Sequence, residues 1–173
     1  MQRCSWLTAD PIYIDYHDTE WGKPITGEDA LFERISLEGF QAGLSWLTIL
    51  KRREGFREAF LGFKIDNVAE LSEQDVERLL TNEGIIRHRG KIQAVINNAR
   101  IIKDQNISLE KLIQKHAPTE DRRNLSISPE STALSKELRG LGFNFVGPTT
   151  MHAMMQAIGI IDDHEDSCEF RNK

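Results

Sequence analysis

The sequence is poor in cysteine: of its 173 residues only Cys4, near the start, and Cys168, near the end, are cysteines. That number excludes a small domain held together by several disulfides, and a stable disulfide is not expected in a reducing compartment. Metal binding, chemical reactivity and ordinary packing remain as roles for the two thiols.

Long apolar runs are also missing. The longest apolar stretches fall far short of the length that crosses a bilayer. The opening stretch MQRCSWLTADP has no apolar segment of the kind found in secretory signals. We therefore expect a cytoplasmic protein that makes no contact with a membrane.

Excess positive charge is a third absence. The formal net charge is -5, which argues mildly against a general nucleic-acid binder. Local basic patches, however, decide phosphate contact more than the net charge does. At 39% hydrophobic and 28% charged residues, the composition shows no bias towards disorder, and the length suits one domain over residues 1–173.

Strand patterns are absent too, because no segment alternates apolar and polar residues for long. The spacing of apolar residues instead predicts an all-α protein. The segment 1–25 is expected to be irregular, broken by Pro11 and Pro24, and residues 117–131 are expected to form a loop. Helices are predicted over residues 28–35, 37–53, 72–80, 91–103 and 108–116, and a helix, a tight turn and a second helix over residues 131–159.

The turn in LRGLGFNFVGPTT contains Gly140, Gly142 and Gly147 around two phenylalanines. Glycines leave backbone amides unshielded, and amides at the start of a helix can bind a phosphate oxygen. The alternative is an ordinary corner between two helices. The basic run GIIRHRGK can likewise contact phosphates or form a solvated surface.

All three tryptophans and both tyrosines lie between Trp6 and Trp46. Within the same region, Glu38 sits among apolar and small residues in SLEGFQAGLSW, and a buried carboxylate needs a partner or shifts its pKa. Aromatic faces with one carboxylate suit a flat cationic ligand. The alternative is a satisfied core in which Glu38 caps a helix.

Four residues at the two ends of the chain are candidate metal ligands: Cys4, His17, His164 and Cys168. Zinc accepts two cysteines and two histidines, and a set of four protein ligands leaves no open position, which makes the ion structural. The alternative is two free cysteines and two surface histidines. The remaining histidines, His88, His116 and His152, lie in predicted helices without cysteine neighbours and are assigned no metal role.

Seven ordered motifs together resemble the 3-methyladenine DNA glycosylase I family over nearly the whole chain: RCSW, DPIYIDYHDTEWGKP, LEGFQAGLSWLTILKRRE, GIIRHRGKIQAVINNA, LSKELRGLGFNFVGPTT, MQAIG and DHEDSC. The resemblance implies an all-helical helix–hairpin–helix glycosylase that acts in base excision repair. Such an enzyme flips 3-methyladenine out of double-stranded alkylated DNA, hydrolyses its N-glycosidic bond and releases the free base. It is expected to be monofunctional, without lyase activity, and monomeric.

The resemblance also implies roles for individual residues. Glu38 and Tyr16 are expected to be catalytic. The substrate base is expected to contact Trp46, Tyr13, Trp6 and Trp21. One structural zinc is expected on Cys4, His17, His164 and Cys168, joining the segments 1–25 and 160–173. DNA contacts are expected from Gly142, Phe143, Phe145, Gly147, Arg87, Arg89 and Lys91.

One feature agrees with the family and two depart from it. The stretch TTMHAMMQAIG, which follows the turn, contains no acidic residue, in agreement with the family's lack of a catalytic aspartate there. The stretch SLEKLIQKHAP and the loop after it are less aromatic and shorter than is usual in the family, and Phe40 replaces a polar residue of some relatives.

Three other functions stay open at this point. A non-catalytic helix–hairpin–helix module would need no aromatic pocket. A zinc hydrolase would need an open coordination position. A glycosylase with lyase activity would need a lysine in the pocket.

Overall fold

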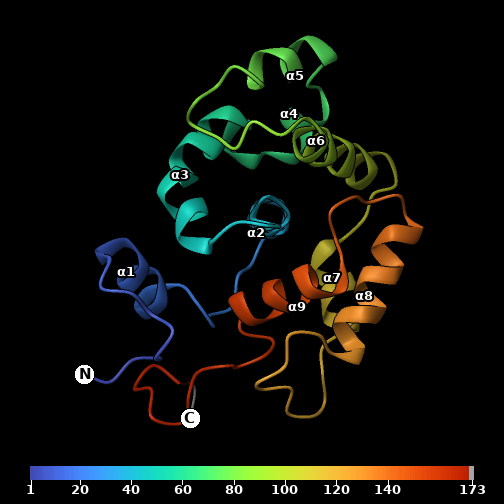
Figure 1. Ribbon diagram of the computed structural model, residues 1–173. Helices are drawn as coiled ribbons and strands as arrows, with labels where there is room; N and C mark the ends of the chain where they lie inside the picture. The colour runs from blue at the N-terminus through green and yellow to red at the C-terminus, as the bar shows by residue number, and fades with distance from the viewer. Residues whose placement is uncertain (172–173) are drawn as a thin grey trace.

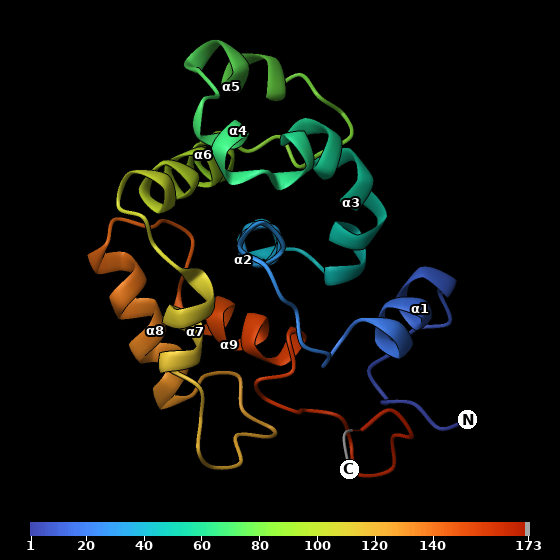
Figure 2. The same cartoon turned by 180° about the vertical axis from the view of Figure 1, so that it is seen from behind.

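The computed structural model describes residues 1–171, and helices are the regular structure that it contains there (Figures 1 and 2). No strand is formed within these residues, so the predicted all-α class is confirmed. The helices are α1 (Pro11–Thr19), α2 (Glu28–Gln41), α3 (Trp46–Ala59), the 3-10 turn η1 (Leu61–Phe63), α4 (Ile65–Ala69), α5 (Glu73–Leu79), α6 (Arg89–Asp104), α7 (Leu109–Lys115), α8 (Pro129–Gly140) and α9 (Pro148–Ala157).

Helix α2 lies at the centre of the molecule and contacts α3, α6, α7 and α9 (Figure 1). Its residues 34–40 are all buried, which a helix covered on every side requires. Two of these seven residues, Arg34 and Glu38, are charged. The central position of α2 therefore carries charge into the interior.

Segment 1–25, which was expected to be irregular, contains a helix. Residues 11–19 form α1, in which Pro11 is the first helical residue and the Asp10 side chain accepts a hydrogen bond from the backbone N–H of Ile12. Proline suits this position because the first N–H groups of a helix have no partner within the helix. Pro11 therefore starts a helix rather than breaking the chain.

The single helix predicted over residues 37–53 is also wrong, because the chain turns between α2 and α3. Gly43 has a φ of 79°, and the Ser45 side chain accepts the backbone N–H of Thr48 as the N-cap of α3. The turn places the end of α2 beside the start of α3, so Glu38 and Trp46 meet across a corner.

Other predicted helices are confirmed. Ser72 and Asp75 form a capping box at the start of α5. The predicted apolar face of α6 is buried: Ile92, Val95, Ile96, Ala99 and Ile102. The loop after α7 ends one turn earlier than expected, since α8 begins at Pro129.

Helices α8 and α9 are joined by a turn of residues 141–147, as the glycine pattern predicts. Gly142 has a φ of 103°, a conformation that favours glycine. Helix α6 holds this turn in place, because Asn98 donates to the carbonyl of Asn144 and accepts the N–H of the same residue, at 3.1 and 3.0 Å.

The two ends of the chain lie side by side (Figures 1 and 2). The backbone N–H of Glu169 donates to the carbonyl of Gln2, and Glu165 accepts hydrogen bonds from the backbone and the hydroxyl of Ser5. Within residues 1–171, no helix has both the length and the apolar character that a membrane span requires.

Candidate functional site

A cavity of about 280 Å³ opens where α1, α2, α3 and α9 converge. It contains all six residues that the sequence analysis assigned to catalysis and to the base, from segments up to 40 positions apart. Its lining residues are Trp6, Tyr13, Tyr16, Trp21, Glu38, Gln41, Trp46, Ala153, Gln156 and Asp163.

Glu38 is the buried acid of this cavity, with only 4% of its surface exposed. Burial raises the pKa of its carboxyl to about 7, against an opposing effect of the Arg34 guanidinium. Near neutral pH, Glu38 therefore titrates between a neutral acid and a carboxylate.

Aromatic rings form the walls around Glu38. Tyr16 and Trp46 lie with their ring centroids 5.7 Å apart, and Trp6 contacts both Tyr13 and Trp21 at 5.3 and 5.0 Å. Such walls offer faces on which a flat ring can stack and to which a cation is attracted. The indole N–H of Trp46 is buried and has no hydrogen-bond partner among the described residues.

Behind Trp6 and Trp21 lies a cluster of metal-ligating groups. One ligand atom each from Cys4, His17 and Cys168 lies within 4.8 Å of the other two. The Nε2 atom of His17 is 3.5 Å from the Sγ atom of Cys168, close to the roughly 3.3–3.8 Å that separates the ligands of a tetrahedral zinc ion.

His164, the fourth predicted ligand, is not among the three residues whose ligand atoms lie within 4.8 Å of one another. Its ring lies 5.3 Å from that of His17, and its Nε2 atom is buried without a hydrogen-bond partner in the described chain. A buried ring nitrogen without a partner, in a ring that faces His17, fits the donor chemistry of a metal ligand. Gly22 makes room for the ring, because a Cβ there would lie 2.6 Å from the Cε1 atom of His164.

Two carboxylates orient the histidines of this cluster. Asp18 Oδ1 lies 2.8 Å from the Nδ1 atom of His17, and Asp162 Oδ1 lies 2.8 Å from the Nδ1 atom of His164. Each carboxylate favours the tautomer that leaves Nε2 as the electron-pair donor, as in many zinc sites. Burial also raises the pKa of the Cys4 thiol to about 12, so the thiol keeps its proton at neutral pH. A bound divalent cation is the usual means of displacing the proton of such a thiol.

The residues chosen for DNA contact divide into two groups. Phe145 is 40% exposed at the tip of the 141–147 turn, and Arg87 and Arg89 are exposed before and at the start of α6. The side chains of Phe143 and Lys91 are buried in the free protein, and a DNA contact by either stays a prediction. Phe143 belongs to the core.

Lys91 supports the end of α2. Its ammonium donates to the carbonyls of Phe40 and Ala42 at 2.9 and 2.7 Å. The last carbonyls of a helix lack partners within the helix, and a cation satisfies them well. Lys91 therefore fixes the corner at which α3 starts.

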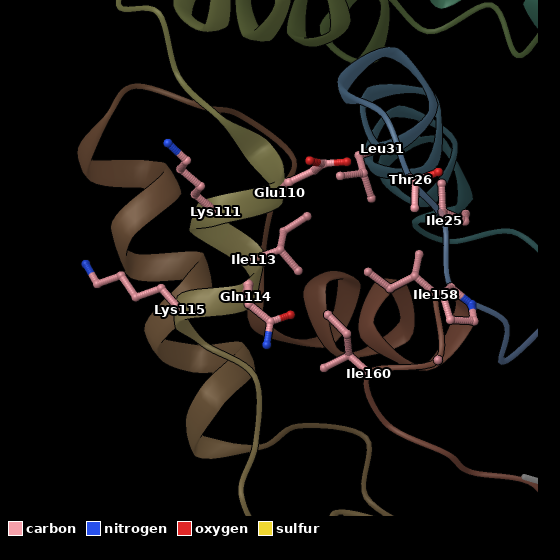
Figure 3. Close-up of a pocket in the computed structure, with 12 residues that line it drawn as sticks. Ile25, Thr26, Leu31, Glu110, Lys111, Ile113, Gln114, Lys115, Ile158 and Ile160 are labelled. Carbon is pink, nitrogen blue, oxygen red and sulfur yellow. The ribbon is translucent and has the colours of Figure 1, made fainter.

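A larger cavity of about 740 Å³ lies elsewhere, between α7 and the segment that follows α9 (Figure 3). Ile113, Ile158 and Ile160 point into it, whereas Lys111 and Lys115 point away (Figure 3). Among the described residues that line it there is neither an aromatic ring nor a buried carboxylate. The smaller cavity is therefore the candidate active site.

Comparison with known proteins shows the family of the chain. The profile of the methyladenine glycosylase family matches residues 6–172, which is nearly the whole chain. The chain belongs to the methyladenine glycosylase family.

Similar members of this family have been named and solved. DNA-3-methyladenine glycosylase 1 of Escherichia coli strain K12 is 48% identical over 179 residues, which cover 97% of this chain and 96% of the relative. A crystal structure of 3-methyladenine DNA glycosylase I (TAG) has a TM-score of 0.94 at 44% identity and covers 99% of this chain and 100% of its own. The Staphylococcus aureus TAG, solved for the structural basis of 3-methyladenine recognition, has a TM-score of 0.90 at 36% identity, covering 100% of this chain and 98% of its own.

In this methyladenine glycosylase, the sequence analysis missed Arg34. Its guanidinium is buried and donates a hydrogen bond to the Tyr16 hydroxyl at 3.1 Å. Arg34 precedes Glu38 by four residues, the spacing that places two side chains on one face of a helix. That spacing was a readable signal, but it does not reveal that the face is buried.

The cavity also contains polar residues that the sequence analysis did not select. Gln156 donates to Asp163 at 2.9 Å, and Asp163 in addition accepts the backbone N–H of Asn124. Asp163 belongs to the same tail as His164, so the tail contributes directly to the cavity wall.

Proposed function

We propose that this protein is a DNA-3-methyladenine glycosylase that acts in base excision repair. The observation that carries the proposal is Glu38, a buried carboxylate at the centre of an aromatic cavity. Two relatives that are 48% and 42% identical to this chain are named for this activity.

Charge explains the preference for the damaged base. An adenine that carries a methyl group at N3 and remains attached to its sugar is a cation, whereas normal adenine is neutral. The faces of Trp46 and Tyr16 attract a cation, and the carboxylate of Glu38 accepts hydrogen bonds from the N–H groups of the base. Normal adenine gains less from both groups.

The same charge makes the base a good leaving group. The bond between the sugar C1′ and the base nitrogen breaks, and its electron pair neutralises the base. A water oxygen then bonds to C1′ and releases a proton. Glu38 chiefly binds the base, while Tyr16 assists through its electrostatic effect on the oxocarbenium-like sugar.

No lyase step is part of the proposal. A lyase needs an amine that attacks C1′ to form a Schiff base. None of the described residues that line the cavity is a lysine. We therefore infer a monofunctional hydrolase, which borohydride cannot trap on damaged DNA.

The target base must leave the duplex to reach the cavity, at a cost in stacking energy. We propose that α8, the 141–147 turn and α9 act as a helix–hairpin–helix that binds a phosphate through the amides near Gly147. One chain carries the whole cavity, so a monomer suffices.

We further propose one structural zinc ion on Cys4, His17, His164 and Cys168. The buried donors, the uncompensated Nε2 of His164 and the two orienting carboxylates support this assignment. When bound, the ion supplies cross-linking of the terminal segments and no chemistry at the sugar, because four protein ligands leave no open position.

Release of 3-methyladenine from methylated DNA tests the proposal. We expect wild-type protein to release it in preference to adenine and Glu38→Ala to lose that preference. Borohydride treatment should yield no protein–DNA adduct. A wild-type protein that binds methylated DNA but releases no base would instead indicate a non-catalytic module, and an adduct would indicate a lyase.

A further inference from the structure

Arg34 is a charged residue in the interior for which the proposed reaction has so far no use. Only 6% of its surface is exposed, although arginine is rarely buried without a dedicated partner. A buried charge costs free energy unless paired or hydrogen-bonded. The contacts of its guanidinium therefore need an account.

The guanidinium contacts residues at the back of the cavity wall and behind it. The guanidinium donates to the Tyr16 hydroxyl at 3.1 Å and lies 5.5 and 5.3 Å from the ring centres of Tyr16 and Trp46. The single carboxylate within salt-bridge range is Glu20, at 3.8 Å. Glu20 is already held by two shorter hydrogen bonds from Arg53, of 2.6 and 2.8 Å.

We propose that Arg34 is a positioning residue for base recognition: it places a buried positive charge one helical turn before Glu38 and orients the Tyr16 hydroxyl. The inference rests on the proposed function, because it concerns the same cavity. Its substrate class is a cationic base, which only an ionised Glu38 can select.

The charge balance of the cavity shows why Glu38 needs this help. The groups that face the cavity from other elements are Tyr13 and Tyr16 on α1 and Asp163 after α9. None of them is a cation, and a nearby carboxylate opposes the ionisation of another. Arg34 is the cation that lowers the pKa of Glu38 against the larger opposing effect of burial.

Protonation of Glu38 would weaken the selectivity. The cavity would lose one of its two carboxylates, Glu38 and Asp163, while the buried guanidinium of Arg34 would keep its charge. Ionised Glu38 restores the attraction for a cationic base. The selection of a cation therefore depends on the state of one carboxyl, which Arg34 stabilises from one helical turn away.

Arg34 also constrains the hydroxyl of Tyr16. An arginine can only donate, so the oxygen of Tyr16 accepts from Arg34 and its own O–H must donate to another group. Tyr16 lines the cavity, which makes the substrate sugar or the attacking water a suitable acceptor. The hydroxyl thus has a defined polarity before substrate binds.

The first experiment reads Glu38 directly. Protein labelled with ¹³C at the glutamate side-chain carboxyl is titrated by NMR, and Glu38→Gln identifies the signal. We expect Arg34→Met to raise the titration midpoint of Glu38 by about one to three pH units, the usual effect of losing a neighbouring opposite charge. Arg34→Lys should retain most of the wild-type value.

Two further variants separate charge from packing. Arg34→Gln removes the charge but keeps a donor for Tyr16, and it substitutes for Arg34→Met should that variant fail to fold. Arg57→Met is the matched control. Arg57 lies on α3 and pairs with Glu33, the neighbour of Arg34 on α2, but it does not line the cavity. The control should leave the titration of Glu38 unchanged.

The second experiment follows single-turnover release of 3-methyladenine from methylated DNA against pH. The acidic limb of the profile should move upward with the Glu38 midpoint in Arg34→Met and Arg34→Gln, so that release at pH 7.5 falls about threefold for a shift of one pH unit and more than a hundredfold for three, and recovers at higher pH. An unchanged midpoint in both variants overturns the inference. A wild-type protein that releases no base overturns the proposed function, while the NMR titration still decides the effect of Arg34.

Discussion

Glu38 opposes folding when it is ionised. Its side chain is buried in the wall of the cavity, and burial raises its pKa to about 7 from a value of 4.5. Proteins often place such groups in their active sites and offset the cost elsewhere. Here the aromatic walls and the core around α2 supply that offset.

The pKa of Glu38 predicts how stability depends on pH. Its folded pKa lies above its unfolded value, so the folded state holds the proton more tightly, and the associated stability is fully present below pH 4.5. That stability is lost as pH rises through about 7. Glu38→Gln should therefore stabilise the protein at pH 8.5, relative to its effect at pH 4.5, by at most about 3 kcal/mol.

Urea unfolding of wild type and Glu38→Gln at both pH values measures this difference. Glu58→Gln is a suitable control, because Glu58 is exposed on α3. Equal differences at the two pH values would show that Glu38 is not the titrating group.

Sequence reasoning was successful with the acid of the cavity and unsuccessful with its arginine, for one reason. Glu38 has apolar and small neighbours, which indicate burial from the sequence alone. Arg34 has Glu33 beside it, and a charged pair in a helix normally faces solvent. Only the central position of α2, covered on every side, places Arg34 inside.

At the scale of elements, the corner between α2 and α3 decides the geometry of the cavity. Helical spacing continues through Ala42 and Gly43, so periodicity alone predicts one helix. The break depends on a positive φ at Gly43, on Ser45 as a cap and on the ammonium of Lys91 at the last carbonyls. The last contact joins residues 49 positions apart, which no local pattern contains.

The turn between α8 and α9 offers a matched pair of glycine substitutions. Gly142→Ala should destabilise the protein by roughly 1–2 kcal/mol, because Gly142 has a φ of 103° and a Cβ would meet Ile101 at 3.1 Å. Gly140→Ala should stabilise it by about 0.5–1 kcal/mol, because Gly140 lies in α8 and a Cβ there meets nothing within 4 Å.

Thermal or urea unfolding gives both values, and binding to an abasic duplex gives the functional effect. We expect Gly142→Ala to weaken DNA binding more than its loss of stability explains, and Gly140→Ala to leave binding unchanged. Equal binding by the two variants would argue against the turn as the DNA-contacting element.

At the scale of the molecule, the terminal segments and the cavity form one unit. Trp6 and Trp21 line the cavity, and both also contact His17, with ring centres 5.5 and 6.0 Å apart. The proposed zinc therefore lies directly behind the aromatic wall. The two pairs of ligands were visible in the sequence, but their meeting depends on the path of the whole chain.

Removal of one metal ligand should loosen this wall before the core. In Cys168→Ser, or after treatment with a strong zinc chelator, we expect amide hydrogen exchange to accelerate first in residues 1–25, which include α1. Exchange in α2 and α6 should change last, because most contacts of these helices are with α3, α4, α7, α9 and each other.

Ser167→Ala, at an exposed neighbouring position, is the control and should exchange like wild type. Metal analysis should find about one zinc ion per chain in the wild type and less in Cys168→Ser. Acceleration spread evenly over all helices would mean that the cluster supports the whole fold rather than the wall.

The contact between His17 and Cys168 also has a consequence for protein synthesis. These residues are 151 positions apart in the chain. At roughly 5–20 residues per second, a ribosome takes about 8–30 s to add the second after the first. During that time the tryptophans near the start of the nascent chain can pack on the core, but the tail that holds the cavity wall in place has not yet been made. The cavity becomes rigid only when the tail emerges, so a prematurely ended chain can fold its helices without acquiring a finished binding site.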